Sequence, residues 1–105
     1  MAERWTPVAQ LADMGPTRRL VCRVAERDIL LVRAGADVLA VDNRCTHLDQ
    51  PLDQGRVMAG QITCPFHGAC FDLRTGEAVS GPAVSPLRCY PARIQDGVVE
   101  LKLDA

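Results

Sequence analysis

Two short cysteine–histidine modules constrain what this chain can fold into more than any other feature of its sequence. The first module is Cys45-Thr46-His47 and the second is Cys64-Pro65-Phe66-His67, with sixteen residues between His47 and Cys64. Each module offers one thiolate and one imidazole, so together they supply a four-ligand set of two sulfurs and two nitrogens. The chain contains only two histidines, and both lie in these modules. We therefore interpret the stretch from Cys45 to His67 as a metal centre.

Three interpretations of this stretch compete. In the first, two buried cysteines and two surface histidines come together by chance and bind no metal. In the second, the four residues form a structural zinc site, although zinc sites usually pair like ligands as Cys-x2–4-Cys and His-x3–5-His. In the third, they hold a 2Fe–2S cluster in which two histidines replace two cysteines on one iron. Because each module here is mixed, the pattern favours the iron–sulfur cluster.

The modules and their flanking residues resemble those of Rieske proteins. The family pattern is Cys-x-His, a spacer near this length, and Cys-x-x-His, which both modules match. The resemblance covers the chain from about Leu20 to its end. Residues outside the ligands that match the family are Thr46, Pro65, Gly68, Phe71-Asp72, Thr75-Gly76 and Gly81-Pro82.

The resemblance implies a ligand set for one Rieske-type 2Fe–2S cluster. By position, Cys45 and Cys64 ligate the buried iron, whereas His47 and His67 ligate the outer iron near solvent. In such a cluster the protein and the sulfides fill every iron position, so no coordination site stays open for a substrate. We therefore expect an electron carrier rather than an enzyme.

Four positions near the ligands predict a low reduction potential. Rieske proteins of cytochrome bc complexes have a disulfide at the positions of Gln50 and Phe66, and hydroxyl donors to sulfur at those of Ala69 and Phe71. Without these donors, negative charge on the sulfurs is less stabilised. We expect a potential on the order of −150 mV. This pattern is similar to the small ferredoxins that serve multicomponent oxygenases.

The resemblance also implies partners. We expect single electrons to pass from a flavin-containing, NAD(P)H-dependent reductase to a terminal oxygenase that acts on aromatic compounds. Both partners would dock near His47 and His67, where apolar loop residues such as Phe66 and Pro82 lie. The alternatives are the small Rieske-like subunit of an assimilatory nitrite reductase, a structural zinc-binding interaction module, and a redox sensor.

Composition limits the remaining choices. With 105 residues, of which 48% are hydrophobic, the chain has room for one domain with one core. A net charge of −1 gives no reason to expect nucleic acid or a membrane surface as partner. The N-terminus lacks a signal-peptide pattern, and the longest strongly apolar run, residues 29–32, is too short to span a bilayer. We expect a soluble, cytoplasmic monomer.

The cysteines and acidic residues outside the ligand set have simpler expected roles. Cys22 and Cys89 are expected to pack in strands, and Cys70 is expected to be packed or partly exposed, with a fifth-ligand role as the alternative. The odd number of these three indicates a reducing compartment rather than a disulfide framework. Asp49 and Asp53 near the first module are expected to be solvated loop charges, with steering of a docking partner as the alternative.

Short strand patterns separated by turn signals predict an all-β fold, a Rieske-like antiparallel sandwich or barrel. Residues 1–105 would form a single Rieske domain, with residues of about 43–83 as a cluster-binding subdomain inserted in a basal β domain. Predicted elements are an edge strand (5–8), a helical turn (9–14), a meander (18–24, 28–33, 38–41), a hairpin (57–63), two strands (69–73, 77–79) and a closing hairpin (88–95, 98–103).

Overall fold

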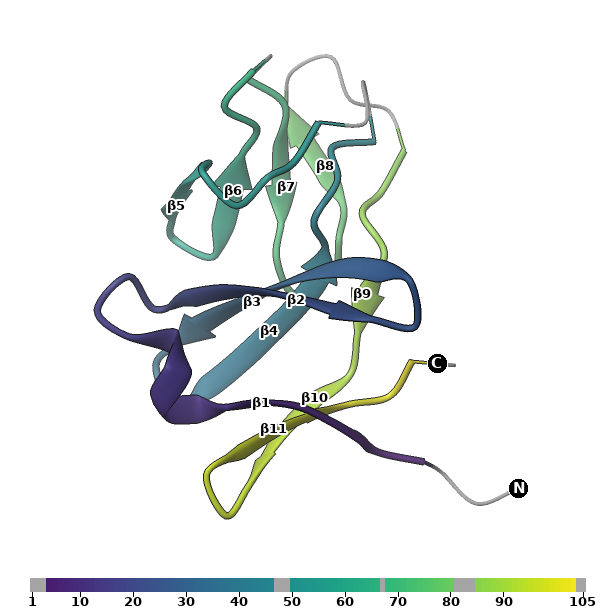
Figure 1. Ribbon diagram of the computed structural model, residues 1–105. Coiled ribbons are helices and arrows are strands. Elements are labelled where there is room, and N and C mark those ends of the chain that lie inside the picture. The colour runs from purple at the N-terminus through teal and green to yellow at the C-terminus, as the bar shows by residue number, and fades with distance from the viewer. Residues whose placement is uncertain (1–3, 47–49, 67, 81–84, 104–105) are drawn as a thin grey trace.

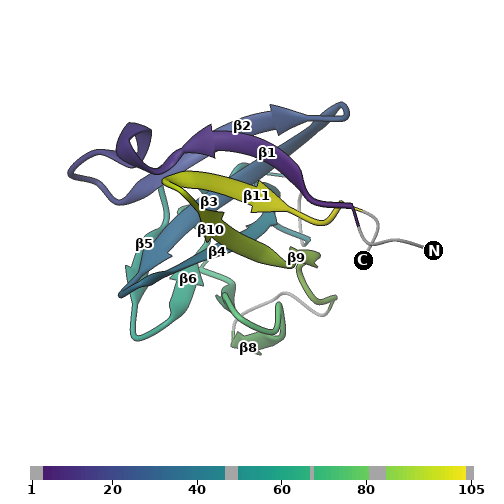
Figure 2. The same ribbon diagram turned by 90° about the horizontal axis from the view of Figure 1, so that it is seen from below.

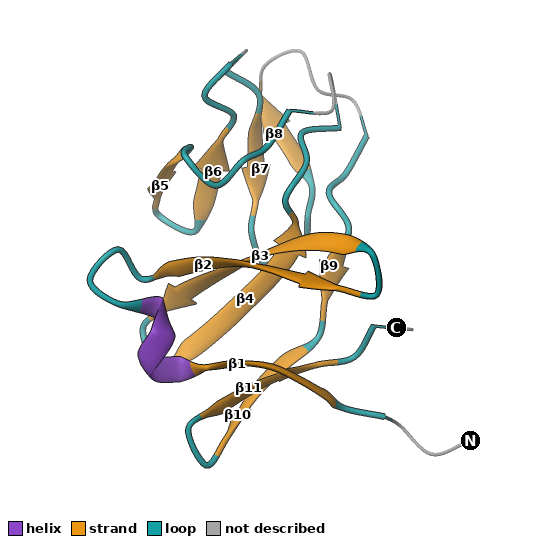
Figure 3. Cartoon of the chain, in the orientation of Figure 1, coloured by secondary structure: helices purple, strands orange, loops and turns teal. Residues whose placement is uncertain are grey.

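The computed structural model describes residues 4–46, 50–66, 68–80 and 85–103. Strands dominate this part of the chain, and its one helix is a single 3-10 turn, η1 (Leu11–Met14) (Figure 3). The strands form three antiparallel sheets, which confirms the all-β prediction. No helix in the described part of the chain is long and apolar enough to cross a bilayer.

The central sheet has the order β2-β3-β4-β9. Its first three strands form the predicted meander, in which each strand pairs with the next through a short turn. The strands are β2 (Arg19–Val24), β3 (Arg27–Ala34), β4 (Asp37–Asp42) and β9 (Cys89–Tyr90).

Both faces of the central sheet are buried, which explains the continuous apolar run in β3. Ile29 and Leu31 pack into a basal core, whereas Leu30 and Val32 pack into a second core on the opposite face. A half-buried strand alternates apolar and polar residues, but a strand covered on both faces does not. The run from Ile29 to Val32 therefore marks the middle layer of the molecule.

The basal sheet covers one face of the central sheet (Figure 2). It has the order β1-β11-β10, with β1 (Thr6–Gln10), β10 (Ala92–Gln95) and β11 (Val98–Leu101). Asp96 and Gly97, which join β10 to β11, both have positive φ values, of 51° and 78°. Positive φ at both central residues is typical of the two-residue hairpin turn predicted there.

The third sheet lies on the other face of the central sheet, at the end of the molecule away from both termini (Figure 1). It has the order β5-β6-β7-β8 and comes from the chain between β4 and β9. Its strands are β5 (Arg56–Met58), β6 (Gln61–Thr63), β7 (Cys70–Asp72) and β8 (Ala78–Ser80). The predicted hairpin around residues 59 and 60 joins β5 to β6.

The prediction of one strand over residues 88–95 is wrong, because this segment serves two sheets. Tyr90 pairs with Ala40 in the central sheet, whereas Ala92 pairs with Leu101 in the basal sheet. Pro91 lies between them and has no N–H to donate to a ladder. The chain therefore changes sheets at this proline.

Candidate metal centre

Cys45 and Cys64 are buried in the same core. Cys45 follows β4 and Cys64 follows β6, and their exposed fractions are 0% and 1%. Leu52, Ala69 and Phe71, all at 0% exposure, belong to the same apolar cluster. The fold thus brings together the two cysteines that the sequence predicts as ligands. The two predicted histidine ligands, His47 and His67, lie outside the described residues.

The segment containing Cys45 is closed by hydrogen bonds at two levels. The Cys45 N–H donates to the Gln50 carbonyl at 2.7 Å. One step outward, the Asn43 side-chain oxygen accepts from the Leu52 N–H at 2.8 Å, and its Nδ2 donates to Asp53 Oδ1 at 3.0 Å. Hydrogen bonds within this segment therefore hold the backbone around the Cys45 thiol in place.

The segment containing Cys64 extends the pairing of β6 and β7. The Cys64 N–H donates to the Ala69 carbonyl at 2.7 Å, and the Gly68 N–H donates to the Cys64 carbonyl at 3.1 Å. Gly68 has φ +76°, a left-handed conformation that glycine adopts without steric cost. The chain thus turns sharply between Cys64 and β7.

A third segment contacts the segment that contains Cys45. The Thr46 hydroxyl donates to the Ser85 carbonyl at 2.7 Å, which links the first module to the chain just before Leu87. Leu87 is buried with both cysteines, and its N–H donates to the Gly76 carbonyl at 2.7 Å. Three stretches that are distant in sequence therefore meet around the buried thiols.

Of the remaining cysteines, Cys22 and Cys89 pack against the apolar clusters as expected, and Cys70 is half-buried. The Cys70 thiol donates to Gln61 Oε1 at 3.3 Å and accepts from the Thr63 hydroxyl at 3.7 Å. Burial raises the pKa of Cys22 and, together with nearby aspartates, that of Cys89. A raised pKa favours the protonated thiol of these two groups, which suits a packing role.

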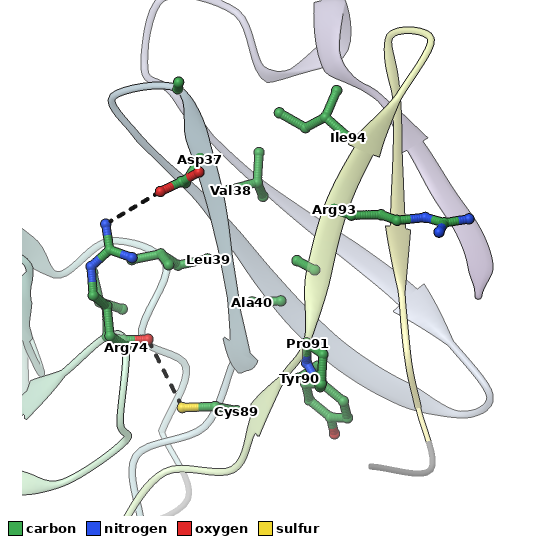
Figure 4. A pocket seen from close by; sticks show the side chains of 13 residues that line it. Asp37, Val38, Leu39, Ala40, Arg74, Cys89, Tyr90, Pro91, Arg93 and Ile94 are labelled. Atoms are coloured by element: carbon green, nitrogen blue, oxygen red, sulfur yellow. Dashed lines mark hydrogen bonds and ion pairs between the residues drawn. The ribbon is translucent and has the colours of Figure 1, made fainter. Parts of the chain in front are cut away.

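Cys89 also borders a groove of about 510 Å³ between β4 and β10 (Figure 4). Arg74, just after β7, also lines this groove and forms an ion pair with Asp37 of β4 at 3.7 Å. The residues that line the groove include neither Cys45 nor Cys64. The groove is therefore separate from the candidate centre.

Asp53 departs from the expectation of a solvated loop charge. One carboxylate oxygen accepts from Asn43, and the other accepts from the Gln54 side chain at 3.0 Å. The Asn43 hydrogen bond, with further hydrogen bonds and the nearby Arg19 charge, lowers the pKa of Asp53. Sequence reasoning missed Asn43 and Arg19. The only local sign that Asn43 has a structural role is its position where the strand pattern of residues 38–41 ends.

The chemistry of the donor set fits an iron–sulfur cluster. All five cysteines are thiols rather than disulfides, and the two in the modules are the fully buried ones. Thiolates are the usual protein ligands of iron–sulfur clusters. No group of three or more metal-binding side chains converges among the described residues, which do not include the histidines.

The comparison with protein families decides between the interpretations of this stretch. Residues 4–91 match the Rieske 2Fe–2S domain family. The chain belongs to this family. Membership implies one Rieske-type 2Fe–2S cluster and confirms the resemblance read from the modules.

Similar proteins include ferredoxin components of oxygenase systems. The ferredoxin subunit of anthranilate 1,2-dioxygenase from Burkholderia cepacia is 30% identical over 99 residues, covering 94% of this chain and 92% of that protein. Ferredoxin CarAc from Metapseudomonas resinovorans is 34% identical over 100 residues, with 94% of each chain covered. These relatives have nearly the length of this Rieske chain.

Solved structures agree with this family assignment. The ferredoxin of carbazole 1,9a-dioxygenase from Nocardioides aromaticivorans superposes with a TM-score of 0.85 at 31% identity, covering 92% of this chain and 95% of that one. A structure of reduced oxygenase in complex with oxidised ferredoxin, from a carbazole 1,9a-dioxygenase, matches with a TM-score of 0.83 at 29% identity. The fold of this chain is thus that of a Rieske ferredoxin.

Proposed function

We propose that this protein is the ferredoxin component of an aromatic-ring oxygenase system. It carries single electrons from an NAD(P)H-dependent flavin reductase to a terminal oxygenase. The observation that supports this most is the match over nearly full length to ferredoxin components of dioxygenase systems, joined to two buried thiols in the predicted modules. We place the protein in the cytoplasm and expect a monomer.

We propose Cys45, His47, Cys64 and His67 as the cluster ligands. The burial of Cys45 and Cys64 supports their assignment to the inner iron, with the histidines on the outer one. A bound Rieske cluster accepts and releases one electron. The buried core around the two cysteines, including Leu52, excludes water from their side of the centre.

Residues of about 43–83 would act as a cluster-binding subdomain. They include the whole of the third sheet and both modules, and they follow β4 and precede β9 of the central sheet. Leu30 and Val41 of the central sheet pack in the same core as Cys45 and Cys64. The base would thus support the subdomain directly under the candidate centre.

Docking is proposed around His47 and His67. Phe66, next to His67 in the sequence, is an exposed aromatic residue, with 56% of its surface accessible. Aromatic residues are enriched in protein–protein interfaces, and a small apolar contact suits a partner that must be released quickly. The known complex of a related ferredoxin with its oxygenase supports a direct encounter of this kind.

Metal analysis and electron-transfer kinetics test the proposal. The purified protein should be red-brown, with two irons and two acid-labile sulfides per chain, as a 2Fe–2S cluster requires. It should be reduced by a flavin ferredoxin reductase and then oxidised by a terminal oxygenase in stopped-flow mixing. A colourless protein holding one zinc, from cells with adequate iron, would disprove the proposal.

A pair of substitutions tests the docking surface. Met58 on β5 has the same exposed fraction as Phe66, 56%, and lies in the hairpin of the third sheet. We expect Phe66→Ser to lower oxygenase turnover with spectrum and potential unchanged, and Met58→Ser to leave turnover unchanged. If Phe66→Ser instead shifted the potential or shortened the cluster lifetime, Phe66 would shield the centre rather than bind the partner.

A further inference from the structure

Asn43 joins the two ends of the segment that contains Cys45. Its backbone N–H donates to the Asp28 carbonyl at 2.8 Å, which fixes this residue to β3. Its side chain accepts from the Leu52 N–H and donates to Asp53, at 2.8 and 3.0 Å. One side chain thus ties the start of the segment to its end. Leu52, the residue it holds, is fully buried in the core that contains Cys45.

Arg19 fixes the end of the same segment to the central sheet. Its Nη1 donates to the carbonyls of Asp53 and Gly55, both at 2.7 Å. On β2, the neighbouring Leu20 and Cys22 pack with the basal core. Side chains alternate between faces along a strand, so Arg19 faces the third sheet. A guanidinium presents several donors in a fixed, planar arrangement, so one arginine can hold two carbonyls at once.

We propose that Arg19, Asn43 and Asp53 form a positioning clamp for the first ligand segment. The clamp holds the chain around Cys45 in its ligating conformation and thereby slows loss of the cluster and sets its electronic environment. The inference rests on the proposed function, since it takes Cys45 as a ligand. The three residues act through Leu52 and the backbone, with no contact to the cluster required of them.

A ligand that is already held in place needs no ordering when it binds. Replacing residues that orient metal ligands typically costs about 10–100-fold in metal affinity. Here the orienting contacts are polar and partly buried. Those of Arg19 link a strand to carbonyls 34 and 36 residues away. Removing them would let the ends of the segment separate.

An exchange of the Asn43 and Asp53 side chains isolates the hydrogen bonds from other effects. Asn43→Asp alone places two carboxylates against each other, and we expect about 10-fold faster cluster loss. Adding Asp53→Asn restores the arrangement. The new carboxylate accepts from the Leu52 N–H and from the new amide, whose oxygen still accepts from Gln54. The double variant should therefore return to the wild-type rate.

Arg19→Met and Arg93→Met form a matched pair for the second half of the clamp. Both remove one guanidinium, but Arg93 pairs with Glu100 in the basal sheet, at 2.6 Å. We expect only Arg19→Met to speed the loss of the cluster. In the electron paramagnetic resonance spectrum of the reduced protein, only this variant should shift the g-values or broaden the lines. Equal effects of the two substitutions would indicate general destabilisation and would overturn the proposal.

The measurements are bleaching of the visible absorption with an iron chelator, electron paramagnetic resonance of the reduced protein, and thermal unfolding. A wild-type rate in Asn43→Asp, or the same fast rate in the single and double variants, would refute the clamp. Iron and sulfide content of the wild type is determined first. If the wild type holds no 2Fe–2S cluster, the proposed function fails as well. If the wild type holds a 2Fe–2S cluster and the variants lose theirs at the wild-type rate, only the clamp proposal fails.

Discussion

Gly55 lies between the chain just before Cys64 and the end of the segment that contains Cys45, so adding one methyl group there should push the two apart. A Cβ at this position would lie 2.3 Å from the Thr63 carbonyl oxygen and 2.9 Å from the Leu52 carbonyl oxygen. Thr63 immediately precedes Cys64, and Leu52 ends the segment closed by Asn43. Both obstacles are backbone atoms, which cannot rotate away as a flexible side chain would.

The magnitude follows from the contacts. Overpacking a filled core costs about 1–3 kcal/mol, and because both contacts are with backbone we expect Gly55→Ala to cost about 3 kcal/mol. For a domain of this size each kcal/mol lowers the melting temperature by roughly 4–8 °C, so the loss should be roughly 12–24 °C. Differential scanning calorimetry of the cluster-loaded protein measures it. We also expect the visible absorption of the cluster to bleach faster, because the substitution pushes apart the chain that follows Cys45 and the chain that precedes Cys64.

Gly35→Asn is the control for glycine replacement. Gly35 has φ +62°, but a Cβ added there would have nothing within 4 Å, and asparagine tolerates the left-handed region. This variant should melt close to the wild type. If Gly55→Ala melted within about 4 °C of the wild type, equivalent to about 1 kcal/mol or less, the backbone would have moved aside at little cost. Glycine would then not be required between the two segments.

Three further outcomes are expected. Cys64→Ser should abolish the visible cluster spectrum, whereas Cys70→Ser should keep it, and absorption spectroscopy separates the two. Ala69→Ser with Phe71→Tyr should raise the potential from a value on the order of −150 mV, because each adds a hydroxyl to the core that holds both thiols, and voltammetry measures the shift. Hydrogen bonds lower the pKa of Asp53, so its stabilising contribution is full above about pH 4 and is lost as the pH falls through its lower folded value. Melting curves in acid should therefore fall less steeply for Asp53→Asn.

The sequence predicted those parts of the fold that local chemistry decides. The Asp96-Gly97 turn requires positive φ at both residues, and that pair signals it without further context. The meander follows from apolar runs separated by turns. The change of sheet at Pro91 was missed, because a proline between two strand-like halves shows only that pairing is interrupted. Which sheet receives each half depends on tertiary packing.

The candidate site likewise has features that local sequence predicts and features that depend on tertiary packing. The modules predicted that Cys45 and Cys64 lie together, because ligand types and their spacing can be read from neighbouring residues. The hydrogen bonds from Arg19 could not be predicted, because they go to backbone carbonyls 34 and 36 residues away and leave no pattern in either partner's side chain. Asp53 was expected in solvent for a related reason. An aspartate in a loop pattern gives no sign of the asparagine that will bind it.

The middle layer links the stability of the fold to the retention of the candidate centre. Along β3, alternate residues enter different cores, so Leu30 packs with the two cysteines while Leu31 packs with the basal sheet. A substitution in the basal core can therefore reach the cysteines only by moving the strand itself, whereas one at Leu30 changes their surroundings directly. Interiors are close-packed, and a strand covered on both faces has little room to shift. The central sheet thus isolates the cysteines from changes in the basal core, and it lets the base of the domain vary while the chain around the thiols keeps its geometry.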